Sequence, residues 1–173
     1  MTLSDIANIG TFIGALGAFI SLIYLGIQVR QAELNQRSIA SQGVAARITG
    51  IVQWSAEPHI ANLRTRVFQG ETDYTAEELT QLSFILRVSL LSLQDTHLQF
   101  KSKLTDQTTM DSTIGGTRPL LASPVFQALW ERGRSHFAKD TQALVDKIIR
   151  ETPLAEPMDI VARFKTDLAA IGA

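Results

Sequence analysis

One stretch near the N-terminus, from Ile6 to Val29, is predominantly apolar and contains no Asp, Glu, Lys or Arg. As an α-helix it would be about 36 Å long, because each residue adds about 1.5 Å, and the hydrocarbon core of a bilayer is about 30 Å thick. The stretch therefore predicts a transmembrane helix. A secretory signal is disfavoured, because Asp5 but no Lys or Arg precedes the run, and because the run is too long for a signal.

The alternative for this stretch is the buried central helix of a soluble bundle. Such a helix usually shows a polar stripe, and here only Asn8, Thr11, Ser21 and Gln28 are polar. They do not form one continuous stripe, which also disfavours a water-filled pore.

The charges beside the stretch predict an orientation. Arg30, Arg37 and Arg47 follow it, against the single acid Glu33. Because Lys and Arg next to a span stay in the cytoplasm, we expect the N-terminus outside. Residues 1–30 are then a transmembrane anchor and residues 31–173 a cytoplasmic helical domain, in which residues 31–55 continue the anchor helix.

Small side chains recur along the stretch. Gly10, Gly14 and Ala18 are four residues apart, as are Gly17 and Ser21. Small residues let helix backbones approach closely in lipid, where packing drives association. These five residues, the small-residue face, predict self-association, although Gly and Ala are common in such helices in any case.

Composition excludes several classes of function. The chain of 173 residues has a net charge of -1, so no strong positive field indicates a nucleic-acid partner. It has no Cys, which excludes disulfides, thiolate catalysis and Cys-ligated metal centres. We expect neither a cofactor nor a metal.

Hydrophobic periodicity and helix-end signals predict an all-α chain with no strands. No Pro lies between Val29 and Ser55, so the anchor helix is expected to continue to about Trp54. Its stripe at helical spacing, Val44, Ile48, Ile51, Val52 and Ser55, is mostly apolar. Further helices are expected at about 58–69, 76–103, 108–121, 124–133, 139–151 and 158–171.

Local signals fix some of these ends. Thr75 and Glu78 form a capping box at the start of the longest of these helices, whose apolar stripe includes His97. Ser123 is the expected cap before a Pro. Residues 114–118, with two adjacent glycines, are expected to form a turn, because they lack the spacing of a phosphate-binding loop.

Three segments resemble a group of uncharacterised bacterial single-pass membrane proteins of similar length. They are AFISLIYLGIQVRQ (18–31), QDTHLQFKSKLTD (94–106) and LLASPVFQALWERGRSHF (120–137). The chain departs from the group at Gln94, where an acid is more usual, and at His97, where an aromatic is usual. The resemblance implies a bacterial inner-membrane location and the same topology, but no mechanism, because the group has no assigned activity.

The richest polar cluster comprises Gln94, Asp95, His97 and Gln99. Asp95 and Gln99 share a helix face, and a buried His beside a carboxylate could do acid–base work or bind a metal. A hydrogen-bonded core or interface histidine explains His97 more simply.

One further histidine and one basic segment have simple structural explanations. His136 lies alone in a polar stretch, where a surface position is the default. Residues 130–134 mix Trp130 with Arg132 and Arg134, which could meet lipid headgroups or RNA. A helix C-terminus with arginines explains them equally well.

These patterns predict a membrane-anchored, self-associating structural or interaction protein, or an accessory subunit of a membrane complex, without catalysis. Its expected partners are membrane lipid and further copies of itself, with another membrane protein as an alternative partner. One alternative is an oligomeric channel-like or lipid-binding assembly. The other is a membrane-tethered enzyme that uses Asp95 and His97.

Overall fold

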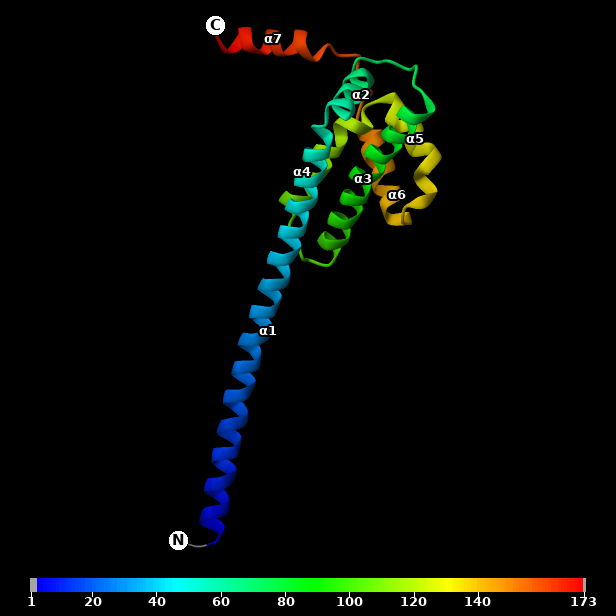
Figure 1. The fold of residues 1–173 in the computed structure, drawn as a ribbon. Coiled ribbons are helices and arrows are strands. Elements are labelled where there is room, and N and C mark those ends of the chain that lie inside the picture. Colours follow the sequence, from blue (N-terminus) through cyan, green and yellow to red (C-terminus); the bar gives the residue numbers. More distant parts are fainter. Residues whose placement is uncertain (1–2, 173) are drawn as a thin grey trace. The chain divides into compact units, whose positions relative to one another are not determined.

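The computed structural model describes residues 3–172, apart from the side chains of residues 5–7. The first residues of the predicted span, Ile6 and Ala7, belong to that exception. The chain forms two compact units, Met1–Ser41 and Gln42–Ala173. Within residues 3–172 all regular structure is helical, with seven α-helices and one short 3-10 helix, so the all-α prediction is confirmed (Figure 1).

Helix α1 (Leu3–Ser55) is continuous over 53 residues, as the absence of Pro predicted. Its part Asn8–Ser55 contains a window apolar enough to cross a membrane, and no side chain of that window is buried. The exposed side chains include Phe12 (69%) and Phe19 (62%). The first unit therefore consists of a single helix whose apolar surface has no partner within the described part of the chain.

The second unit contains the hydrophobic core. After α1 come α2 (Pro58–Phe68), α3 (Ala76–Lys101), α4 (Gln107–Leu121), α5 (Pro124–Gly133), η1 (Arg134–His136) and α6 (Lys139–Glu151). Helix α3 packs against α2, α4 and α5, and α4 also packs against α6. The buried core comprises Ile60, Leu63, Val67, Leu82, Ile85, Leu86, Leu90, Leu93, Met110, Leu120, Leu121, Phe126, Trp130, Val145 and Ile148.

The capping box at the start of α3 is confirmed. The Glu78 N–H donates to Thr75 Oγ1 at 3.2 Å, and the Thr75 N–H donates to the Glu78 carboxylate at 2.8 Å. Arg66 of α2 also pairs with Glu78, and with Glu71 at 2.6 Å. The N–H of Thr75, and then Arg66, lower the pKa of Glu78. This network joins the end of α2 to the start of α3.

The predicted inward stripe of α3 is wrong near its C-terminal end. Thr96 is fully buried at 0% exposure, whereas His97 is only half-buried. The side of α3 that faces the core shifts gradually around the helix axis along its length, as shown by the buried positions Leu82, Leu86, Leu93 and Thr96. At this turn Thr96 therefore faces the core, rather than His97. The Thr96 hydroxyl is satisfied by the Ser92 carbonyl at 3.0 Å.

Residues 114–118 are helical, which confirms the helix predicted at about 108–121 and makes the turn predicted within it wrong. They lie inside α4, where Met110, Thr113, Thr117, Leu120 and Leu121 are buried. Burial of this stripe against α3 outweighs the low helix propensity of two glycines. Pro119 lies in the last turn of α4, where it removes only one hydrogen bond of the helix.

Helix α5 begins at Pro124 as predicted, but the expected capping bond is absent. Ser123 occupies the cap position with no side-chain hydrogen bond to the helix, and its buried Oγ has no partner among the described residues. Sequence therefore located the helix start correctly but assigned the wrong contact to the hydroxyl.

Helix α7 (Ile160–Ile171) forms where expected but does not pack into the bundle. None of its residues is buried, and Val161, Phe164 and Leu168 are all more than half exposed. Its first turn is capped by Asp159, which accepts from the Val161 N–H at 2.9 Å. The predicted apolar face exists, and it faces solvent.

Candidate functional site

The small-residue face is fully exposed on α1. A Cβ added at Gly10, Gly14 or Gly17 would meet nothing within 4 Å. At about 100° per residue, the five residues of this face span an arc of about 100° on the helix. The Ser21 hydroxyl donates to the Gly17 carbonyl at 2.8 Å, so it is satisfied within the helix. The face is therefore smooth, uncharged and open to a second helix.

The polar cluster on α3 is divided between two structural roles. Asp95 Oδ2 lies 2.5 Å from the Arg47 guanidinium of α1 and accepts from Gln99 Nε2 at 2.7 Å. Both α1 and α3 contribute these residues within the second unit. Asp95 therefore fastens the last turns of α1 to α3.

Gln94 makes a different contact. Its Oε1 accepts from the Thr141 hydroxyl at 3.1 Å and lies 3.4 Å from the Ala138 N–H. These groups belong to the start of α6, whose cap residue Ala138 makes no side-chain hydrogen bond of its own. Gln94 therefore links α3 to the start of α6.

The structure does not join His97 to Asp95. No hydrogen bond or ion pair links the two within residues 3–172, and the buried His97 Nδ1 has no partner there. His97 lies close enough to Asp140 to lower its pKa, but Lys101, which pairs with Asp140, is the main cause of that shift. In the described chain no group of His, Asp and Glu is arranged to hold a metal.

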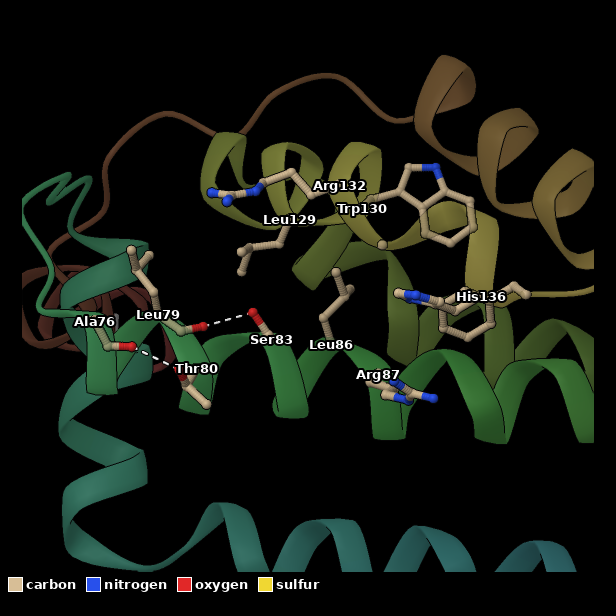
Figure 2. Close-up of a pocket in the computed structure, with 12 residues that line it drawn as sticks. Ala76, Leu79, Thr80, Ser83, Leu86, Arg87, Leu129, Trp130, Arg132 and His136 are labelled. Carbon is tan, nitrogen blue, oxygen red and sulfur yellow. Dashed lines mark hydrogen bonds between the residues drawn. The ribbon is translucent and has the colours of Figure 1, made fainter.

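A pocket of about 430 Å³ lies between α3 and α5 (Figure 2). Its apolar side chains include Leu79 and Leu86 of α3 and Leu129 of α5. Of the described residues, its only charged or titratable lining residues are Arg87, Arg132 and His136, and none of the lining residues is a carboxylate.

The hydroxyls of this pocket are not activated. Ser83 donates to the Leu79 carbonyl at 2.7 Å and Thr80 to the Ala76 carbonyl at 2.8 Å, as the dashed lines in Figure 2 show. The pocket offers apolar contact and positive charge, but no nucleophile held by a base.

The neighbouring Arg134 has a structural role that sequence did not reveal. It pairs with Asp146 of α6, and the same carboxylate accepts from Trp130 Nε1 at 2.9 Å. Asp146 therefore holds α5 and η1 against α6. The two arginines of residues 130–134 therefore have different surroundings. Arg134 forms an ion pair that joins η1 to α6, whereas Arg132 lines the pocket.

No protein-family model matches this sequence, and neither the curated proteins nor the solved structures contain a match. Function therefore has to be inferred from the residues and contacts of the chain itself.

Proposed function

We propose that this chain is a membrane-anchored protein that self-associates and acts through its contact surfaces rather than by catalysis. The observation that carries the proposal is the exposed, uncharged surface of α1 between residues 8 and 29, which contains the small-residue face. Exposed apolar area on this scale is unfavourable in water and favourable in a bilayer. Lipid and a second copy of the helix are the partners that fit it.

The polar cluster supports a non-catalytic role. The proposed acid–base pair would need Asp95 to orient His97, but the Asp95 carboxylate is engaged by Arg47 and Gln99. Gln94 accepts a hydrogen bond from the Thr141 hydroxyl at the start of α6. These residues hold helices together, which is the work expected of a structural domain.

The direction of insertion is part of the same proposal. Arg30 and Arg37 follow the apolar segment, and Arg37 pairs with Glu33 at 2.6 Å on the exposed surface. The excess of Arg favours a cytoplasmic second unit. The resemblance of residues 18–31 to bacterial single-pass anchors supports the bacterial inner membrane as its location.

Native mass of the detergent-solubilised protein tests the self-association. Gly14→Leu should convert a defined oligomer to monomer, because the added side chain holds the backbones apart. Gly26→Leu is the matched control: it makes the same change about 120° away on the helix, where no contact is proposed. A wild-type monomer, or an oligomer that survives Gly14→Leu, would refute assembly through this face.

A further inference from the structure

A second hollow, of about 600 Å³, lies within the unit Gln42–Ala173. We call it the Arg64 groove. The last turns of α1, together with α2, α3 and α4, line it. Its apolar side chains are Ile48, Ile51, Val52, Ile85, Pro119 and Leu120.

The wall that α1 contributes is incompletely covered. The stripe from Val44 to Ser55 is mostly apolar, but only Val44 of that stripe is buried. Ile48 is 43% exposed and Val52 is 61% exposed. Both line the groove, so the apolar surface of α1 there is exposed.

Among the described residues, Arg64 is the only charged one that lines the groove. It is half-buried, and its buried Nε makes no hydrogen bond in the described chain. Among the described side chains no carboxylate forms an ion pair with Arg64, and its guanidinium lies over the Phe68 ring, 6.0 Å from the centroid. Burial lowers the pKa of Arg64.

Arg66, on the same helix, differs from Arg64 because its guanidinium forms ion pairs with carboxylates. It pairs with Glu71 and Glu78, and these partners raise its pKa. A desolvated cation is costly unless an anion accompanies it. The Arg64 groove therefore has an apolar wall and a positive charge that lacks a counter-ion.

We propose that the Arg64 groove binds a single-chain amphiphile with an anionic head group, of which a long-chain fatty acid is the simplest. The carboxylate pairs with Arg64, and the acyl chain covers Ile48, Ile51 and Ile85. The Ser92 hydroxyl, which also lines the groove, offers a further polar contact. The volume falls within the range of small-molecule sites. This inference is independent of self-association.

Photolabelling of the full-length protein in lipid nanodiscs tests the site. The probe is a diazirine-bearing dodecanoic acid, and the labelled peptides are mapped after digestion. We expect label in peptides containing residues 48–56 and 85–92. Arg64→Ala should reduce it about tenfold, as loss of a charge-assisted contact predicts. Arg87→Ala, an exposed arginine at the other pocket, should leave it unchanged, and the methyl ester of the probe should label about tenfold less.

A second variant blocks the groove without removing the charge. Gly116 lines it, and a Cβ there meets nothing within 4 Å, so Gly116→Leu fills the groove and improves helix propensity. It should abolish groove labelling while the unfolding temperature is kept or raised. Label confined to residues 8–29, or label unchanged in both variants, would each overturn the proposal.

Discussion

At the scale of the residue, two helices end with the same motif but with different residues at its left-handed position. Gly70 (φ 83°) follows α2 and Lys103 (φ 58°) follows α3. In both, the next N–H donates to the carbonyl five residues before it, at 3.1 Å for Glu71 and 2.9 Å for Leu104. A left-handed backbone suits glycine and strains lysine, so the two sites respond oppositely to substitution.

Gly70→Ala should destabilise the second unit by about 2 kcal/mol, because a Cβ is disfavoured at this φ. The Cβ would also lie 2.7 Å from Pro157 Cγ, closer than side chains tolerate. Urea unfolding followed by tryptophan fluorescence measures the change. Gly115→Ala is the control, since Gly115 is helical with open space around it, and it should stabilise by up to about 1 kcal/mol. Equal effects at both positions would contradict the conformational argument.

Lys103→Gly should stabilise the same unit by about 0.5–1 kcal/mol, because glycine relieves the strain and keeps the hydrogen bonds of the motif. Ser102→Gly, one residue earlier at φ -83°, should instead destabilise, since no strain exists there to relieve. A loss of stability in Lys103→Gly would show that the lysine side chain makes a contact that matters more than its backbone.

At the scale of the element, Asp95 fastens α1 to α3. Asp95→Ala should lower the free energy of unfolding by about 1 kcal/mol, because it removes a half-exposed ion pair with Arg47 and leaves Gln99 unpaired. Asp111→Ala is the matched control, because Asp111 bonds only to Gln107 within its own helix. If both variants unfold alike, the contact between α1 and α3 does not depend on Asp95.

Helix α3 begins at its capping box, as the sequence predicted. Helix α6 also has the predicted bounds, although its cap residue Ala138 makes no side-chain hydrogen bond. The predicted end of α3 was two residues too late, because Lys103 gives no sign of a left-handed conformation. The predicted turn at residues 114–118 failed because burial against α3, a tertiary effect, overrode local propensity.

The candidate site was less predictable than the fold. Sequence brought Gln94, Asp95 and Gln99 together on one helix, but their partners lie elsewhere in the chain. Arg47 is on α1, and Thr141 is on α6. Periodicity shows which side of a helix is apolar and carries no information on which distant residue meets it. The unpaired Arg64 was missed for the same reason.

At the scale of the whole molecule, acid should weaken the second unit. The pKa of Glu78, Asp106 and Asp140 is lowered in the folded chain by the Thr75 N–H, the Thr109 N–H and Lys101 respectively. Because these pKa values are lower in the fold than in the unfolded chain, their stabilisation is complete above the ordinary carboxyl values of about 4. It is lost as pH falls through the folded-state values.

Urea unfolding at pH 7, 5, 4 and 3 measures this dependence. We expect a constant free energy of unfolding down to about pH 5 and a decline below about pH 4. Glu78→Gln should start lower at pH 7 and decline less, because one of the three carboxyls no longer titrates. A profile that is flat to pH 3 would contradict the assignment of these contacts.

The proposed topology can be tested by thiol labelling. The chain has no cysteine, so an introduced cysteine gives the only labelling signal from this protein. Ser4→Cys and Ser135→Cys place single thiols on either side of the proposed span. A membrane-impermeant maleimide should label Ser4→Cys in intact spheroplasts and Ser135→Cys only after lysis. The opposite pattern would show that the orientation is reversed. Recovery of the protein in the soluble fraction would refute the membrane anchor.

Helix α7 has no buried residues, so tertiary packing contributes little to its stability. It is 12 residues long, and isolated helices of that length are marginal in water because nucleation is unfavourable. Its backbone amides should therefore exchange with solvent far faster than those of α6, whose Val145 and Ile148 are buried. Any surface that meets its apolar face must also order this segment, so the resulting contact is readily reversible and responsive to small changes in its surroundings.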